Sequence, residues 1–343
     1  MSNNASAISL RERTNGYTLS AQQYLVVAYA ALGALTVIVL SGAAVRLTGS
    51  GLGCPTWPKC YGSYYPPLNT HAVIEFSNRA VSVPVVLFAG AAWVGALRRR
   101  PYRRDLTLLG ALLPLGVVAQ AVLGGFTVKG ALDYGWVMGH FALSMLILVA
   151  AMALVWRARE DRERDSAPAQ AERIADRGLL RMLLGLAALG ALTIFAGTAA
   201  TAAGPHAGGS PGQRINRLSF DGHGTMDFVI HRHGEIALAF GLAAVALWWL
   251  ARRREAPETV RRPLTVLCWL LALQGLVGLD QYKTHLPTEL VWVHVLLACC
   301  SWLAALWAAC AAGAVAPRRR PGMAERRAEG SLSSVASAQF PGN

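Results

Sequence analysis

The sequence predicts an all-α integral membrane protein, with eight transmembrane helices arranged as two tandem four-helix bundles. Three observations predict this class: the composition, the recurrence of long uncharged windows, and an internal repeat. The chain of 343 residues is 54% hydrophobic and only 15% charged, whereas soluble domains average about 25% charged residues. Its apolar runs approach the length of about 20 residues that a membrane helix needs. They exclude a β-barrel, whose strands would alternate over about 10 residues.

The eight uncharged windows are expected to form the eight helices. They are residues 24–44, 80–97, 106–128, 134–156, 182–203, 236–251, 263–279 and 290–316. The windows 236–251 and 263–279 are slightly short, so each must draw a polar residue into the bilayer to span it. Such polar residues are candidates for function, because they are costly in a membrane.

The basic residues predict the orientation of the chain. A net charge of +13 would suggest nucleic acid as the partner of a soluble protein. Here 24 of the 32 Lys and Arg residues fall in alternate loops and at both ends of the chain. The positive-inside rule places those segments in the cytoplasm. We therefore expect a multi-pass protein of the cell (plasma) membrane that binds no nucleic acid. Its expected cytoplasmic segments are an N-terminal tail (1–23), a linker (157–181) and a C-terminal tail (317–343).

An internal repeat divides the chain into two units. Residues 120–129 (QAVLGGFTVK) match residues 274–283 (QGLVGLDQYK) with an offset of 154, and the same offset relates His140 to His294. The ends of the first and fifth windows, near Gly42 and Gly197, are related by 155. We therefore expect an N-terminal four-helix unit at 24–156 and a C-terminal unit at 182–316. Because four is even, the two units share one orientation.

The loop after the first window is expected to be structured and functional. Residues 46–60, RLTGSGLGCPTWPKC, are rich in Gly and Pro and form far more than a tight turn. Cys54 and Cys60 lie on the outer, oxidising side, which predicts a disulfide. A zinc site would want two further ligands, and none is near in sequence. The four other cysteines fall inside apolar windows and are expected to pack as small hydrophobes.

Polar residues gather at the outer ends of the even-numbered windows. They are Glu75, Asn78 and Arg79 before the second window, His140 in the fourth, His231 and His233 before the sixth, and His294 in the eighth. Haem iron takes axial histidines from facing helices, and helical bundles are where such sites are built. Haem is therefore the favoured cofactor. Outer cations such as Arg46 are candidates to pair with its propionates.

Four motifs together resemble the haem A synthase family. They are segment 46–60, EFSNR at 75–79, HFALS at 140–144 and GPHAGG at 204–209, and the resemblance covers nearly all of residues 24–316. It implies an eight-helix oxidoreductase that oxidises the C8 methyl of haem O to the formyl of haem A for terminal oxidases. It also implies a haem b held by two histidines in the C-terminal half, and the substrate haem O in the N-terminal half.

Carried over by residue, the resemblance makes His294 one haem b ligand and His140 its counterpart in the substrate-haem pocket, with Arg46. Glu75 matches the glutamate assigned a catalytic part, with Arg79 beside it. The chain departs from the family's commonest Glu-x-x-His-Arg motif at Asn78. Because Asn is a poor iron ligand, we expect the substrate haem to be held by His140 alone or to lack a permanent axial ligand.

The sequence leaves the second haem b ligand open between His231 and His233. These residues lie about 200° apart on a helix, so they cannot both face one iron. His231-Arg232 resembles the family's His-Arg pair, whereas His233-Gly-Glu235 resembles the His-small-acidic form of similar members. Aligning either histidine with Asn78 requires a gap of one residue relative to the offset of 154, so the repeat does not decide between His231 and His233. We favour His233.

The sequence also leaves other functions and partners open. The main alternative is a bis-histidine haem b membrane cytochrome that transfers electrons without substrate chemistry, and a haem exporter or carrier is another. The cytochrome explains the histidines equally well but does not explain Glu75 beside Arg79 at a second, incompletely ligated pocket. Haem O synthase and cytochrome oxidase assembly factors are expected partners. The electron donor, the oligomeric state and the order of hydroxylation steps are not given by the sequence.

Overall fold

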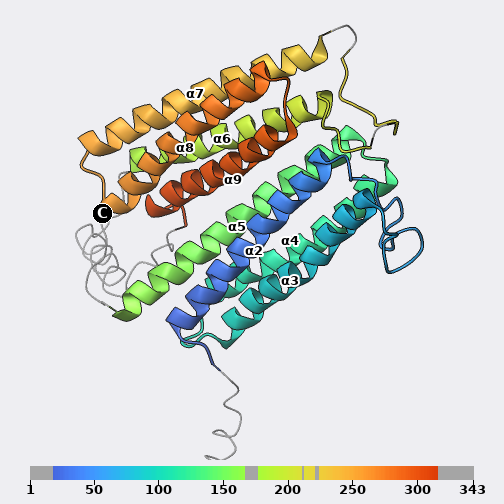
Figure 1. Ribbon diagram of the computed structural model, residues 1–343. Helices are drawn as coiled ribbons and strands as arrows, with labels where there is room; N and C mark the ends of the chain where they lie inside the picture. Colours follow the sequence, from blue (N-terminus) through green and yellow to red (C-terminus); the bar gives the residue numbers. More distant parts are fainter. Residues whose placement is uncertain (1–17, 167–176, 211, 221–223, 316–343) are drawn as a thin grey trace, which may run out of the picture.

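A computed structural model describes residues 18–166, 177–210, 212–220 and 224–315 of the chain (Figure 1). Its helices are α2 (Ala21–Leu47), α3 (Thr70–Arg98), α4 (Arg104–Lys129), α5 (Tyr134–Ser166), α6 (Arg177–Ala203), α7 (Thr225–Arg253), α8 (Glu258–Lys283) and α9 (Thr288–Ala311). All eight are long and apolar enough to cross a membrane. Within the described ranges the remaining regular structure is limited to two isolated β-bridges. The predicted all-α membrane class is confirmed. Most of the expected tails, 1–23 and 317–343, lies outside the described residues.

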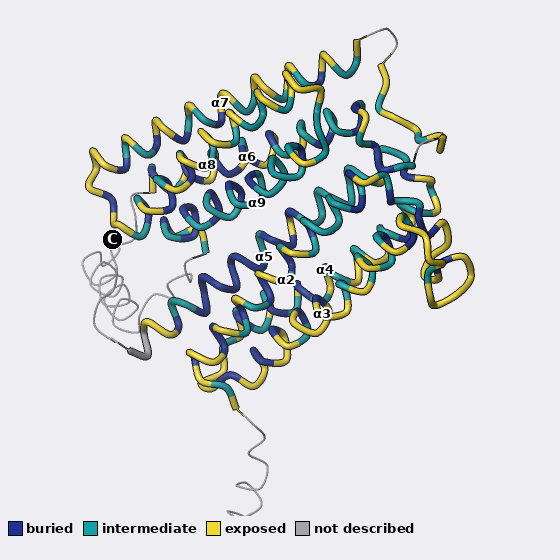
Figure 2. The backbone as a smooth tube through the Cα atoms, viewed as in Figure 1, coloured by how far each residue is buried: buried dark blue, intermediate teal, exposed yellow. Residues whose placement is uncertain are grey.

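The helices form two four-helix bundles that stand side by side (Figure 1). Helix α2 contacts α3 and α5, and α4 lies between α3 and α5. Helices α6, α7, α8 and α9 form the same ring in the second bundle. The bundles meet where α9 contacts α2 and α5 and where α5 contacts α6. Buried residues are concentrated there, on α5 and α9 (Figure 2). The predicted tandem arrangement is therefore confirmed.

Indole groups and a glycine-rich loop join the two bundles. The Trp292 Nε1–H donates to the Leu40 carbonyl, and the Trp302 Nε1–H donates to the Met145 carbonyl, both at 3.2 Å. An indole N–H in an apolar layer needs such an acceptor. Beyond the C-terminal end of α2, a Cβ on Gly49, whose φ is +65°, would lie 2.9 Å from the carbonyl oxygen of Gly209. Glycine is therefore required where the loops of the two units touch.

Several helices differ in length from the uncharged windows. Helices α7 and α8 extend well beyond the expected 236–251 and 263–279, whereas α9 ends at Ala311, before the expected 316. Helix α5 continues to Ser166, inside the expected linker, and α6 begins at Arg177. Paired charges one turn apart, such as Arg159 and Glu163, stabilise such polar helix ends. A count of apolar residues does not detect them.

The structure also locates the irregularity in the internal repeat. Helices α3 and α7 both have 29 residues and are offset by 155 at both ends, whereas α4 and α8 both have 26 residues and are offset by 154. The single-residue difference therefore lies in the short connections between these helices. Asn78 and His233 consequently occupy the same position in their helices, eight residues beyond Thr70 and Thr225.

A buried ionic cluster holds α3, α4 and α5 together at the end of the first bundle that lies away from the loop between α2 and α3. Asp161 pairs with Arg99 at 2.9 Å and with Arg103 at 2.7 Å, while Asp105 pairs with Arg157 at 2.6 Å. The hydrogen bond to the Asp105 carboxylate raises the pKa of Arg103 above its ordinary value. Only 1% of Arg99 is exposed. By contrast, the pair between Arg262 and Glu258 in the second bundle is exposed.

Candidate functional site

Helices α7 and α9 bring two histidines together inside the second bundle. The ring centres of His233 and His294 lie 6.2 Å apart, and the ring planes are inclined by 74°. When two imidazoles bind one metal ion from opposite sides, each metal–nitrogen bond is about 2 Å long and each ring nitrogen lies roughly 1.1 Å from its ring centre. The two ring centres are then about 6 Å apart. The two imidazoles therefore have the spacing of two axial ligands of one metal ion.

The hydrogen bond of His233 selects a tautomer suited to metal binding. Its Nδ1 lies 3.1 Å from the carbonyl oxygen of Thr193 on α6. A carbonyl oxygen only accepts hydrogen bonds, so Nδ1 carries the proton. The lone pair is then on Nε2, where a metal ion binds, and the Thr193 carbonyl fixes the ring orientation.

His140 and His294 have the same surroundings in the two units. The Nε2–H of Gln120 donates to the His140 carbonyl at 2.9 Å, and that of Gln274 donates to the His294 carbonyl at 3.1 Å. In both histidines Nδ1 is buried and has no hydrogen-bond partner among the described residues. Buried polar atoms without partners are rare in native proteins, so each requires an explanation such as an absent bound group.

Glycines make room for each of these imidazoles. A Cβ on Gly124 would lie 3.3 Å from Cε1 of His140, and one on Gly278 would lie 3.3 Å from Cε1 of His294. A Cβ on Gly197 would lie 3.1 Å from Cε1 of His233. Sequence reasoning did not give Gly124 and Gly278 a role. Their equal spacing from the glutamines of the repeat, four residues in each unit, is the signal that identifies them.

His231 lies outside this cluster. Its side chain is exposed, its Nδ1 contacts the Asp227 carbonyl at 2.7 Å, and its ring centre lies 6.2 Å from that of Tyr282. The geometry thus places His233 rather than His231 beside His294.

The corresponding position in the first bundle holds an amide instead of an imidazole. The Ser41 hydroxyl of α2 lies 2.7 Å from Oδ1 of Asn78 on α3. A Cβ on Gly42 would meet nothing within 4 Å, in contrast to one on Gly197. The first unit therefore combines one half-buried histidine, His140, with a smaller polar pair. Sequence reasoning missed Ser41, because its contact with α3 depends on how the helices pack.

Glu75 is buried beneath the loop between α2 and α3, with 5% of the residue exposed. Its Oε2 accepts a hydrogen bond from the Cys54 amide at 2.6 Å, and its Oε1 accepts one from Arg79 at 2.5 Å. The Arg79 guanidinium also donates to the carbonyls of Cys54 at 2.9 Å and Thr56 at 3.0 Å. The uncharged window began only at residue 80, but α3 begins at Thr70, so Glu75 lies in the early turns of the helix, where the sequence predicted it.

Cys54 and Cys60 form the predicted disulfide, which closes this loop above Glu75. Among the described residues there is no group of three or more His, Cys, Asp and Glu that could hold a metal ion without haem. Arg46 lies in the last turn of α2 beside Gly208, and its Nε is buried without a partner in the described chain. This Nε–H is therefore available to a hydrogen-bond acceptor.

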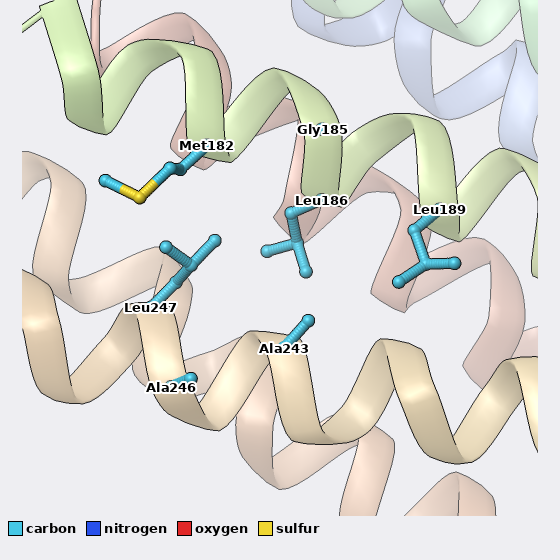
Figure 3. A pocket seen from close by; sticks show the side chains of 7 residues that line it. All are labelled: Met182, Gly185, Leu186, Leu189, Ala243, Ala246 and Leu247. Atoms are coloured by element: carbon cyan, nitrogen blue, oxygen red, sulfur yellow. The ribbon is translucent and has the colours of Figure 1, made fainter.

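A separate groove of about 320 Å³ lies between α6 and α7 (Figure 3). It is lined by Met182, Gly185, Leu186, Leu189, Ala243, Ala246 and Leu247. All of these residues are apolar, so the groove offers no group for chemistry. The histidine cluster remains the candidate site.

Three relatives illustrate what the chain is similar to. Protoheme IX farnesyltransferase of Thermus thermophilus is 28% identical over 78% of this chain and 45% of the relative. Heme A synthase of Lysinibacillus sphaericus is 35% identical over 37% of this chain and 42% of the relative. The chain therefore spans less than half the length of these two. Heme A synthase of Shewanella oneidensis is 25% identical over 75% of this chain and 87% of the relative.

The model of one protein family matches most of the chain. This family is described as cytochrome oxidase assembly protein, and the match covers residues 25–306, which include all eight helices except the first few residues of α2 and the last few of α9. The same residues hold the histidine cluster, the Asn78 position and the loop above Glu75. The chain belongs to the cytochrome oxidase assembly protein family.

Proposed function

We propose that this protein is a haem A synthase, an oxidoreductase that converts the C8 methyl of haem O to the formyl group of haem A for terminal oxidases. The observation that carries the proposal is the pair of His233 and His294, with ring centres 6.2 Å apart, in a chain of this family. The names of the Lysinibacillus and Shewanella relatives support the same activity.

The residues of the second bundle fit a haem b. His233 and His294 would supply its two axial nitrogens, and the Thr193 carbonyl would hold His233 in the required tautomer. The imidazole of His294 lies against Gly278 of α8, which leaves room for the ring. When bound between these two histidines, haem b would supply one-electron redox chemistry.

The residues of the first bundle fit the substrate haem O. His140 offers a half-buried imidazole, and Asn78 occupies the position on α3 that His233 occupies on α7. Arg46, with its unpartnered Nε, is suited to pair with a propionate. In this proposal Glu75 is the catalytic carboxylate, because an anion stabilises positive charge that develops on a methyl carbon during its oxidation. Arg79 positions that carboxylate.

The comparisons also bear on partners and location. The Thermus relative is named for farnesyl transfer to protohaem, and the matched part is only 45% of its length. This supports a haem O synthase as a partner that delivers the substrate. The family description supports partners that assemble cytochrome oxidase. The charge distribution supports the plasma membrane with both termini in the cytoplasm, and the electron donor is a further partner to be identified.

The experiment that tests the proposal is extraction and chromatography of haems from cells with and without the gene. We expect haem A only when the gene is present, and haem O accumulating when it is deleted. Haem A at equal levels in both strains, with haem b bound to the purified protein, would instead identify an electron-transfer cytochrome.

A further inference from the structure

The two bundles differ at one repeat-related position, and the difference changes the chemistry of the first pocket. In the second bundle, Nδ1 of His233 binds the carbonyl of Thr193. The offset of 155 relates Thr193 to Ile38, and in the first bundle the Ile38 carbonyl lies 3.1 Å from the Ser41 hydroxyl instead. The hydroxyl in turn contacts Asn78. Ser41 and Asn78 together therefore link α3 to this carbonyl of α2, whereas in the second bundle the single imidazole of His233 makes the equivalent link.

The Asn78 amide retains a free donor. Its Oδ1 accepts from Ser41, and in the described part of the chain its Nδ2 makes no hydrogen bond. An amide nitrogen carries two protons that can be donated. If the amide is turned over, one proton is donated to the Ser41 oxygen and the other is still available. A hydrogen-bond donor is therefore present in either orientation.

The space that an imidazole would use is open in the first bundle. A Cβ on Gly197 would lie 3.1 Å from the His233 ring, whereas a Cβ on Gly42, at the equivalent position, would meet nothing within 4 Å. On the other side of the pocket, His140 matches His294 in its contacts with a glutamine and a glycine. His140 thus offers a metal ligand on one side, whereas the other side has open space beside Gly42 and the hydrogen-bond donor of Asn78.

On the basis of the proposed function, we propose that the substrate haem in the first bundle is bound through His140 alone. Its sixth coordination position, beside Asn78, is a binding site for a diatomic ligand, which the Asn78 amide N–H stabilises by a hydrogen bond. Hydrogen-bond donors and steric access on the distal side of a haem decide whether it binds such ligands. The haem b position, with two imidazoles, does not bind them.

The test uses carbon monoxide as the probe, added to the reduced full-length protein loaded with haem O. We expect the haem O to be high-spin before the addition and to bind CO, while the haem b spectrum stays unchanged. Asn78→His is expected to give a low-spin haem O that binds CO at least about tenfold more weakly, which corresponds to ~1.4 kcal/mol. Ser77→Ala, at an exposed neighbouring position on α3, is the matched control and is expected to behave as the parent.

A second variant isolates the hydrogen bond and keeps the test decisive if Asn78→His does not fold. Asn78→Leu is expected to bind CO but to raise the infrared C–O stretching frequency, because the donor is lost. An unchanged frequency would overturn the role of the amide. Parental protein that makes haem A but holds haem O low-spin without binding CO would overturn the inference and leave the proposed function intact. Parental protein that neither binds haem O nor makes haem A would overturn both.

Discussion

Glu75 and Arg79 form an ion pair of 2.5 Å one turn apart on α3, and both residues also bind the backbone of the disulfide-closed loop. The carboxylate accepts the Cys54 N–H, and the guanidinium donates to the Cys54 carbonyl. The pair therefore fixes this loop against α3. It also holds a buried carboxylate at this end of the first bundle, so one pair of residues has both a structural and an electrostatic effect.

Glu75→Gln separates these two effects. The amide keeps the shape of the side chain and can still accept from Cys54, but it carries no charge. We expect the variant to fold and retain haem b while haem A formation falls by about 100-fold or more, the usual cost of removing an electrostatic catalytic group. The measurement is the ratio of haem A to haem O in extracts, and accumulation of haem O or of a hydroxylated intermediate is expected. Glu235→Gln removes the carboxylate from an exposed pair with Arg232 and serves as the control. Haem A made at the parental rate by Glu75→Gln would assign Glu75 to structure alone.

Substitution of the clustered histidines tests the haem b assignment. If His233 and His294 bind the iron as proposed, the purified protein should show a low-spin, six-coordinate haem b in its reduced spectrum. We expect His233→Ala and His294→Ala to lose this signal. His231→Ala should keep it, because His231 contacts Asp227 and Tyr282 instead. A normal low-spin spectrum in His294→Ala would show that the iron is held elsewhere.

The disulfide between Cys54 and Cys60 is open to a direct chemical test. Mass spectrometry of protein from aerobic cells, alkylated before and after reduction, should find both thiols blocked until the reductant is added. Cys54→Ser should lower stability by about 2–3 kcal/mol, the loop-entropy estimate for a short loop. Cys300→Ser, at a half-buried free cysteine, is the control and should change little. Two free thiols in the unreduced protein would contradict the disulfide.

Asp161→Asn tests the buried ionic cluster of the first bundle. The carboxylate is shared by Arg99 and Arg103, and its loss removes the main compensation for buried positive charge. Breaking such a pair costs about 3–5 kcal/mol, so thermal unfolding in detergent should shift strongly downward. Glu258→Gln, which removes the exposed partner of Arg262, should cost about 0.5 kcal/mol or less. Equal unfolding temperatures for the two variants would refute a stabilising role for the cluster.

Much of the fold could be predicted from the sequence because it depends on local properties. The transfer of about 20 apolar residues into a bilayer is decided window by window, so the number and order of the helices follow from composition alone. The repeat offset then placed His140 and His294 at equivalent levels, and the position of Cys54 and Cys60 on the oxidising side predicted their disulfide. Helix ends were less predictable, because charged residues such as Arg159 and Glu163 extend a helix by pairing with each other.

The tertiary structure decided which residues meet. The rotation of α7 about its axis brings His233, rather than His231, to His294 on α9. The offset of the repeat changes by one residue in the connection between α7 and α8, which aligns His233 with Asn78. The contact of Ser41 with Asn78 and the pairing of Arg99 with Asp161 join residues on different helices, far apart in the sequence. Hydropathy gives the depth of a residue in the membrane, but the facing side chains are fixed only when whole helices pack against one another.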